Sequence, residues 1–268
     1  MSGGRFASRS CLVTGSTGMA ASAARALTAE GGSVFVVSRD PDHARALADE
    51  LTASGGRAAW QAADVAREDD VEAAVEACAS TFGRLDAVYN VAGISGRRFG
   101  DGPAHEATLA GWETVLATNA TSIFLVCRAV LRRMLDQAPD AQGTRGVILN
   151  MSSTLARQPS PIHFGTHAYA ASKGAIEAFT RSLAASYAPH GIRINAIAPS
   201  VVATPMSRRA QDDPAIRTYL EAKQPLARGP ITTDDVTPTA LHLLSADARM
   251  ITGQVIDVDG GWSVSEAG

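Results

Sequence analysis

Cysteine, excess charge of one sign and a cleavable apolar leader are all scarce or missing in this chain of 268 residues. The three cysteines, Cys11, Cys78 and Cys127, lie far apart and form no CxxC pair. This argues against a disulfide framework or a zinc site and favours buried thiols in a reducing compartment. The 24 Lys and Arg against 27 Asp and Glu give a net charge of −3, without the basic excess of nucleic-acid or membrane-surface proteins. The N-terminal "MSGGRFASRS" has no apolar core, so we expect a cytoplasmic protein.

Uninterrupted apolar runs and metal-binding spacings are missing as well. The most apolar helical stretch, "SIFLVCRAVLRRML", contains Arg128, Arg132 and Arg133, which argues against a membrane span. The six histidines show no HExxH or other metal spacing, so we expect no metal. No G-x-S-x-G elbow surrounds Ser153, which argues against a serine hydrolase.

Short β-branched segments alternate with helical patterns along almost the whole chain. Seven segments have the composition of buried strands: Cys11–Thr14, Val34–Ser38, Arg57–Gln61, Ala87–Asn90, Val147–Met151, Arg193–Ala198 and Val255–Val258. Six segments between them have helical periodicity: Met19–Glu30, Pro41–Ser54, Glu68–Phe82, Leu109–Gln137, Tyr169–Ala188 and Thr233–Leu244. The alternation predicts an α/β protein with about seven parallel strands and helices on both faces. No linker interrupts it, so we expect one doubly wound domain over 1–268, with its core at about 10–262.

The glycine-containing stretch "LVTGSTGMAAS" joins the first predicted strand to the first predicted helix. In a doubly wound sheet this turn binds pyrophosphate, because glycines admit the anion and the helix N-terminus presents free N–H groups. Gly15 and Gly18 supply the flexible positions, and Ala20 and Ala21 are small enough for close helix packing. Taken alone, the stretch fits an ordinary strand-to-helix turn equally well.

Further short motifs stand in order at the ends of the later strands. They are "DV" at Asp64–Val65, "NVAG" at Asn90–Gly93, "NMSS" at Asn150–Ser153, "YAASK" at Tyr169–Lys173, "NAIAPS" at Asn195–Ser200 and "TGQVIDVDGG" at Thr252–Gly261. With them the sequence resembles the compact one-domain branch of the short-chain dehydrogenase/reductase family, from about Ser10 to Trp262. The resemblance implies a Rossmann-type fold and an NAD(P)-dependent oxidoreductase that moves hydride between a nicotinamide and a secondary alcohol or ketone. One departure is the glycine loop, a residue shorter than the family's T-G-x-x-x-G-x-G.

Tyr169 and Lys173 are four residues apart in a helical segment, so their side chains share one face. A nearby ammonium is expected to lower the pKa of the phenol, which could then exchange a proton with an alcohol or ketone oxygen. The resemblance implies that Ser153 donates a hydrogen bond to that oxygen and that Asn119 completes a proton relay through water. Each residue alone also fits a structural role, but the four in order favour catalysis.

The resemblance also implies which residues hold the cofactor. They are Gly15, Ser16, Thr17, Gly18 and Met19 of the glycine loop, and Asp64, Val65, Asn90, Ala92, Gly93, Tyr169, Lys173, Pro199, Val202 and Thr204 at later positions. Val91 replaces a usual second asparagine, and Ser200 stands where glycine is more common.

The end of the second predicted strand bears on the choice of cofactor. NAD-specific sites carry an acid there, which binds the ribose 2′-hydroxyl. Here Ser38 and Arg39 predict NADP(H), because Arg39 can pair with a 2′-phosphate. Asp40 keeps NAD open, since a shift of one residue would bring an acid to the ribose.

The segment "TLARQPSPIHFGTHA", between two of the proposed catalytic residues, is the most individual part of the chain. Pro159 and Pro161 predict a stiff, extended course beside the reacting centre. Ile162–Phe164 would form an apolar and aromatic tip, so we expect His163 and Phe164 to select a moderately hydrophobic substrate. The same tip is about equally compatible with a subunit interface.

Three expectations concern the lid, the assembly and other functions. Residues 200–228 are long, polar and rich in turn signals, as a substrate lid would be. Leu109–Gln137 and Tyr169–Ala188 carry more apolar positions than one sheet face can cover, and the family pairs these helices across a two-fold axis, so we expect a homotetramer. The expected substrate is a small-molecule alcohol or ketone. The short glycine loop leaves open a non-catalytic nucleotide sensor of the same fold. An epimerase or dehydratase would normally need an additional substrate domain.

Overall fold

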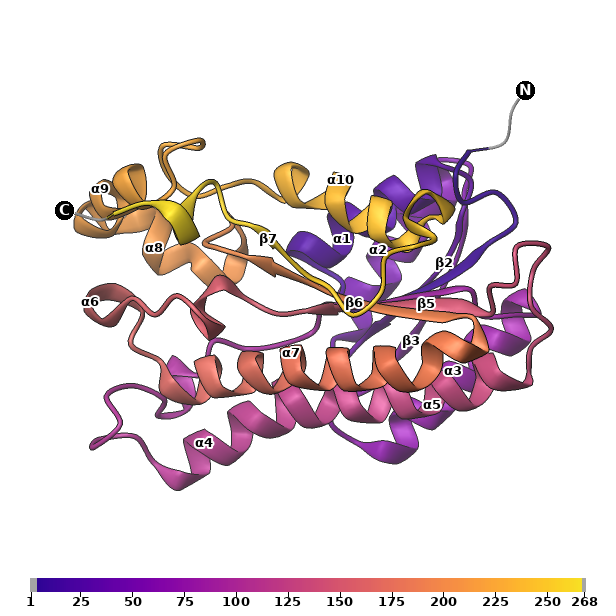
Figure 1. Ribbon diagram of the computed structural model, residues 1–268, viewed down its shortest axis with the longest axis horizontal. Coiled ribbons are helices and arrows are strands. Elements are labelled where there is room, and N and C mark those ends of the chain that lie inside the picture. The colour runs from indigo at the N-terminus through magenta and orange to yellow at the C-terminus, as the bar shows by residue number, and fades with distance from the viewer. Residues whose placement is uncertain (1–3, 267–268) are drawn as a thin grey trace.

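Seven parallel strands form one sheet in the computed structural model, which describes residues 4–266 (Figure 1). The strands are β1 Ser10–Thr14, β2 Ser33–Ser38, β3 Arg57–Ala62, β4 Ala87–Asn90, β5 Gly146–Met151, β6 Ile192–Pro199 and β7 Val255–Val258. Their order, β3-β2-β1-β4-β5-β6-β7, reverses between β1 and β4. In such a sheet the ligand crevice opens at this reversal, beyond the carboxyl ends of the strands. The predicted α/β fold is confirmed.

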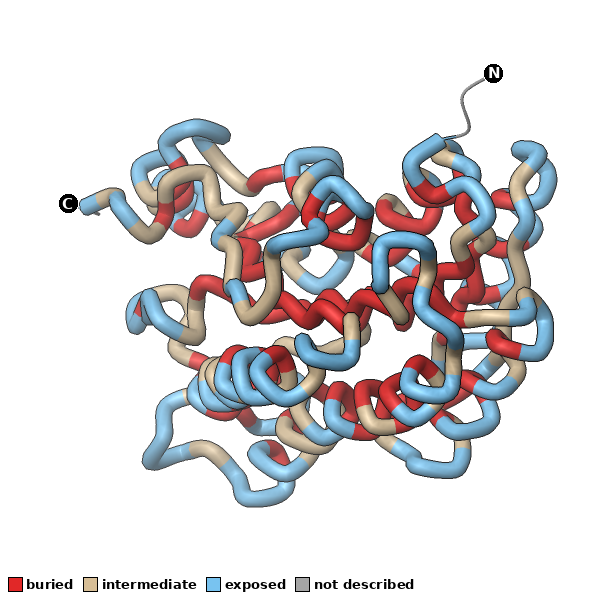
Figure 2. Tube along the Cα trace, turned by 45° about the vertical axis from the view of Figure 1, so that its right-hand side comes forward, coloured by how far each residue is buried: buried red, intermediate tan, exposed pale blue. Residues whose placement is uncertain are grey.

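The middle strands are hydrophobic on both faces because helices cover both sides. Every residue of β1, β4, β5 and β6 is buried, whereas the edge strands β3 and β7 are mostly half-buried. Figure 2 shows the same contrast, with a buried sheet at the centre and exposed outer turns of helices around it. Runs of Val, Ile and Leu without polar alternation are what a parallel sheet of this kind requires. The three cysteines are buried, and none of them forms a disulfide bond within residues 4–266.

Helices form one layer on each face of the sheet (Figure 1). One layer contains α1 Gly18–Ala29, α2 Pro41–Ala53 and α10 Thr233–Leu244, and the other α3 Glu68–Phe82, α4 Leu109–Leu116, α5 Ser122–Asp136 and α7 His167–Tyr187. The predicted start of α2 is confirmed: Asp40 accepts hydrogen bonds from the N–H groups of Asp42 and His43, and Pro41 is the first helical residue.

The predicted continuous helix over Leu109–Gln137 is interrupted. A π-helical turn, Ala117–Thr121, separates α4 from α5 and holds the buried Asn119. A π turn accommodates one extra residue, which an apolar repeat of three and four residues does not reveal. Interruptions of this type are frequent at functional sites.

Leu109–Asp136 is the one stretch within residues 4–266 that is long and apolar enough to cross a membrane. Of its most apolar window, 56% is buried inside the protein. Arg128 pairs with Glu68 of α3, and Arg132 pairs with Glu72. These ion pairs and this burial identify the stretch as a core helix of the fold.

Three short helices lie beyond the carboxyl ends of the strands, and the sequence pattern did not reveal them. They are α6 Pro161–Phe164, α8 Arg208–Asp212 and α9 Pro214–Lys223. The predicted extended course is wrong at Pro161, which instead begins the single turn of α6 at a position where its missing N–H costs nothing. Asp213 and Pro214 begin α9 by the cap-and-proline signal that also begins α2.

A small separate core holds these short helices together. Ile216 and Leu220 of α9 and Ala210 of α8 pack with Val201 and the fully buried Trp262, which follows β7. The segment expected to be a lid is therefore anchored by helices of its own and by a tryptophan from the end of the fold.

Candidate active site

The four predicted catalytic residues come together at the carboxyl end of the sheet. Ser153 follows β5, and Tyr169 and Lys173 lie on the first two turns of α7; all three line one cavity with Gly93. Asn119 lies behind it in the π turn, and a Cβ at Gly93 would lie 3.0 Å from Asn119 Oδ1 and 3.7 Å from Lys173 Nζ. A side chain at this position would press against the carboxamide of Asn119, so glycine allows the loop after β4 to lie close to it.

Lys173 is buried, and its ammonium is directed at the end of β5. Nζ donates a hydrogen bond of 2.8 Å to the carbonyl oxygen of Met151 and lies 5.6 Å from the centre of the Tyr169 ring. Burial lowers the pKa of Lys173 to about 8, because the charged form loses its hydration.

The phenol of Tyr169 does not show the lowered pKa that the spacing suggested. Burial raises its pKa, and a hydrogen bond with Ser153 acts in the opposite direction without cancelling that effect. Lys173 lies beside the ring and bonds Met151 instead of the hydroxyl, so its charge does not offset the burial. A raised pKa favours the protonated form of Tyr169 at neutral pH.

Asn119 fixes the loop after β4 to α7. Its Nδ2 donates to the carbonyl oxygen of Ile94 (3.0 Å) and to Ser172 Oγ (3.1 Å), while Oδ1 accepts from the N–H of Ile94 (2.8 Å). Both amide hydrogens are used within the protein. The side chain thus positions the loop and the helix, and its place in a proton relay remains a prediction.

Asp101 was not identified from the sequence, yet it holds the start of α7. Its buried carboxylate accepts hydrogen bonds from the N–H groups of Ala168 (3.0 Å) and Tyr169 (2.9 Å). Thr166, the residue at the cap position, makes no side-chain cap bond. No local pattern could show this, because the cap comes from a loop far away in the chain.

The glycine loop has the geometry of an anion cradle. Gly15 and Gly18 adopt φ values of +100° and +54°, and a Cβ at Gly18 would lie 3.1 Å from Thr204 Cγ2. Thr17 caps α1 without a side-chain hydrogen bond, so no side chain occupies the first N–H groups of the helix. These features fit the pyrophosphate of a dinucleotide, despite the shorter loop.

A groove runs from this loop across the carboxyl ends of β2, β3 and β4. Of the predicted cofactor residues, those that line it are Gly15, Ser16, Thr17, Gly18, Met19, Ser38, Arg39, Asp64, Val65, Ala92, Gly93 and Thr204. His43, Ile94 and Thr118 also line the groove and were not predicted.

The remaining predicted cofactor residues lie elsewhere. Tyr169, Lys173 and Pro199 line the cavity that contains Ser153, and Val202 lines a neighbouring cavity described below. Asn90 is buried under the groove, where its Nδ2 donates to Asn150 Oδ1 at 2.9 Å. Its role is to join β4 to β5.

The two candidates for reading the cofactor's ribose have different surroundings. The carboxylate of Asp40 accepts hydrogen bonds from the N–H groups of Asp42 and His43 at the start of α2. The bond from His43 is the main cause of its lowered pKa. Arg39 and Asp40 both line the groove, but Asp40 also pairs with His43, whereas Arg39 forms no ion pair with any residue in 4–266. The last residue of β2 is Ser38, which is not an acid. Its Oγ accepts a hydrogen bond of 2.9 Å from Ser16 Oγ.

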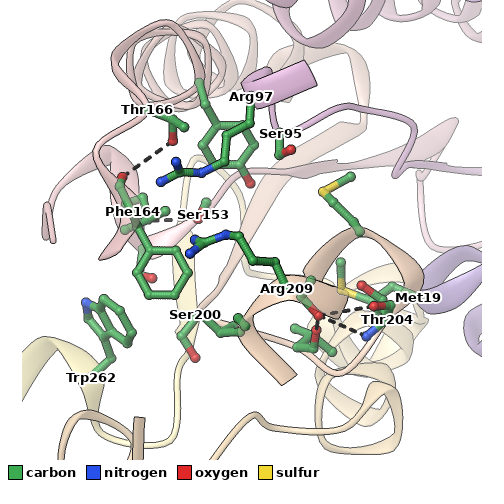
Figure 3. Close-up of a pocket in the computed structure, with 18 residues that line it drawn as sticks. Met19, Ser95, Arg97, Ser153, Phe164, Thr166, Ser200, Thr204, Arg209 and Trp262 are labelled. Atoms are coloured by element: carbon green, nitrogen blue, oxygen red, sulfur yellow. Dashed lines mark hydrogen bonds between the residues drawn. The ribbon is translucent and has the colours of Figure 1, made fainter. Parts of the chain in front are cut away.

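A second cavity adjoins the catalytic residues on the side of the short helices (Figure 3). Phe164 lines it as expected, but His163 does not: its ring packs on Tyr219, with centroids 4.9 Å apart. Residues that line the cavity but were not predicted from the sequence are Arg97, Leu155, Met206, Arg209 and Trp262. Within the described part of the chain, no three His, Cys, Asp or Glu side chains gather as metal ligands.

Comparison with known proteins agrees with this architecture. A family model described as "Enoyl-(Acyl carrier protein) reductase" matches residues 13–263. D-threitol dehydrogenase of Mycolicibacterium smegmatis is 35% identical over 261 residues, covering 97% of this chain and 95% of its own. A gluconate 5-dehydrogenase from Burkholderia cenocepacia, solved with NADP and tartrate, has a TM-score of 0.87 at 30% identity, covering 97% of this chain and 96% of that one.

A 3-ketoacyl-(acyl-carrier-protein) reductase from Brucella melitensis, solved with NADH, has a TM-score of 0.83 at 32% identity, covering 96% of this chain and 99% of that one. The family match and the dehydrogenases and reductases among the relatives support an oxidoreductase. The chain belongs to the short-chain dehydrogenase/reductase family.

Proposed function

We propose that the protein is an NAD(P)-dependent oxidoreductase that interconverts a secondary alcohol and a ketone. The observation that supports this most directly is the common cavity of Ser153, Tyr169 and Lys173, placed between the glycine-loop groove and the second cavity. A substrate oxygen beside Ser153 and Tyr169 would lie at the junction of the two.

Tyr169 and Ser153 act on the substrate oxygen in different ways. In ketone reduction, Tyr169 Oη gives its proton to the carbonyl oxygen while Ser153 Oγ donates a hydrogen bond to the same atom. The nicotinamide, when bound, supplies the hydride for the carbonyl carbon, or accepts it in the reverse direction. Lys173 holds the end of β5 through Met151, and Asp101 fixes the first turn of α7, so the hydroxyls keep their relative positions.

A screen of alcohols and ketones with both nicotinamide cofactors, followed by nicotinamide absorbance, tests the proposal. Turnover of secondary alcohols or ketones supports it. Tight cofactor binding without turnover of any of them would favour the alternative, a nucleotide sensor, which the short glycine loop suggests.

NADP(H) is the proposed cofactor, because Arg39 is free to meet a 2′-phosphate and Asp40 is engaged at α2. Arg39→Ala is expected to raise KM for NADPH about 10- to 100-fold, as loss of charge-assisted hydrogen bonds would. KM for NADH should change little, which steady-state kinetics with both cofactors will show. A wild-type kcat/KM higher with NAD(H) than with NADP(H) would contradict the assignment.

A homotetramer is the proposed assembly. On α4 and α5 the apolar side chains of Leu109, Trp112, Phe124 and Leu135 are 72%, 40%, 43% and 39% exposed, and contact with another subunit would remove them from water. Light scattering at micromolar concentration is expected to give about four times the chain mass of 27.8 kDa. A monomeric mass would refute the proposal.

Phe164 is proposed to set substrate selectivity, since it lines the second cavity against Trp262, with ring centroids 5.9 Å apart. Phe164→Ala should raise kcat/KM for bulky ketones relative to small ones by about tenfold, because it widens the apolar wall. His163→Ala is the matched comparison, and from its position on Tyr219 a smaller change is expected. Unchanged ratios with loss of the oligomer would instead assign this loop to a subunit interface.

A further inference from the structure

Two arginines enter the second cavity from opposite segments of the chain. Arg97 lies on a 3-10 turn, Arg97–Phe99, in the loop after β4, and Arg209 lies on α8. Both line the cavity together with Ser153 and Tyr169. Figure 3 shows their guanidinium ends facing the same space, near Phe164 and Ser153.

Both guanidinium groups converge on one neutral acceptor. The carbonyl oxygen of His163 accepts a hydrogen bond from Arg97 Nη2 (2.9 Å) and another from Arg209 Nη2 (2.7 Å). Arg209 also lies over the ring of Phe164, 5.7 Å from its centroid. Two cations thus share a single carbonyl and keep most of their donors for other partners.

Within residues 4–266, no carboxylate forms an ion pair with either arginine. Asp101 is the acid whose charge acts on Arg97 and by itself raises its pKa. Its two carboxylate oxygens accept hydrogen bonds from the N–H groups at the start of α7. The pKa of Arg97 is lowered, first by burial and then by the charge of Arg209. An anion between the two guanidinium groups would relieve this repulsion.

The rest of the cavity defines the body of the ligand. Leu155, Phe164, Met206 and Trp262 give it apolar and aromatic walls, while Ser153 and Tyr169 mark the reacting end. We propose that the substrate is a hydroxy acid or oxo acid, whose carboxylate is bound by Arg97 and Arg209 and whose apolar body lies against these walls. This inference rests on the proposed oxidoreductase function and narrows its substrate class.

Matched acids and esters test the inference with the cofactor-loaded enzyme. The probes are levulinate and para-acetylbenzoate, each compared with its methyl ester, which keeps the ketone and removes the charge. We expect kcat/KM to be about 10- to 100-fold higher for at least one acid than for its ester, as bidentate, charge-assisted binding would give. Arg97→Met and Arg209→Met should each reduce that acid-to-ester ratio about tenfold or more.

Adjacent arginines provide the controls. Arg98→Met and Arg208→Met remove the same charge from the same two turns, but neither residue lines the cavity, so the acid-to-ester ratio should not change. If the esters are turned over at least as well as their acids, the proposal of an anionic substrate is wrong. The oxidoreductase proposal would still stand.

A binding measurement covers the case in which no ketone is turned over. Calorimetric titration of para-acetylbenzoate and of its methyl ester is then compared between the wild type and Arg209→Met. Tighter binding of the acid that disappears in Arg209→Met supports the anion site even if the oxidoreductase proposal has failed. Equal binding of acid and ester overturns it.

Discussion

Tyr169→Phe is expected to lower kcat about 10²- to 10⁴-fold while leaving the affinity for the cofactor nearly unchanged. The substitution removes only the hydroxyl that exchanges a proton with the substrate oxygen, and positioned general acids contribute rate factors of this size. The ring and its place on α7 remain, since the cap from Asp101 is made to backbone N–H groups. Turnover is followed by nicotinamide absorbance and affinity by fluorescence titration of the reduced cofactor.

The same residue predicts the direction of the pH dependence. Burial keeps the pKa of Tyr169 above its usual value, so the phenol is protonated at neutral pH and suits ketone reduction. Alcohol oxidation needs the deprotonated form, and its kcat/KM should therefore rise as pH increases from neutral to alkaline. If Tyr169→Phe kept most of the wild-type kcat, Tyr169 would not be the general acid or base.

Lys173→Met is expected to lower kcat/KM about 10²- to 10³-fold, the range found when a preorganised electrostatic group is removed. The family resemblance implies that the ammonium would also bond the nicotinamide ribose, so we expect cofactor affinity to fall as well, in contrast to Tyr169→Phe. The comparison of the two variants separates a proton carrier from a positioning cation.

The same variant should be more stable than the wild type at neutral pH. Burial lowers the pKa of Lys173 from 10.5 to about 8, so the unfolded chain binds more protons than the folded one between these values. Keeping the buried ammonium charged below pH 8 costs on the order of 3 kcal/mol, part of which Lys173→Met recovers. Denaturant unfolding should show a gain at pH 7 of about 1–3 kcal/mol that shrinks as pH approaches the ordinary lysine pKa. A destabilised variant at pH 7 would contradict this account.

The sheet could be predicted from the sequence because its signals are local. Most strands are short runs with β-branched residues, and the predicted bounds of β4 and β7, Ala87–Asn90 and Val255–Val258, are the observed ones. The start of α2 at Pro41 was predicted correctly, whereas the same cap-and-proline signal at Asp213–Pro214 was missed. The position of a motif at a strand end then placed it at one edge of the sheet, since parallel strands end on the same side.

The substrate side could not be predicted in the same way, because long-range contacts build it. Arg97, Arg209 and Trp262 come from three separate segments, and nothing in their local sequence shows that they line one cavity. Asp101 likewise caps a helix far along the chain. His163, which lies next to Phe164 in the sequence, packs on Tyr219 of α9, a contact between segments that are distant in the chain.

The π turn at Ala117–Thr121 has a consequence for how this chain tolerates insertions and deletions. Because the π turn already accommodates one extra residue, removing one residue there would restore a regular helix from α4 into α5. The wide turn that presents Asn119 would then be lost, and the carboxamide that joins Ile94 to Ser172 would leave its partners. Length in this helix is thus constrained as tightly as residue type, and a deletion of one residue should be more harmful here than in the loop at 139–145, which only connects α5 to β5.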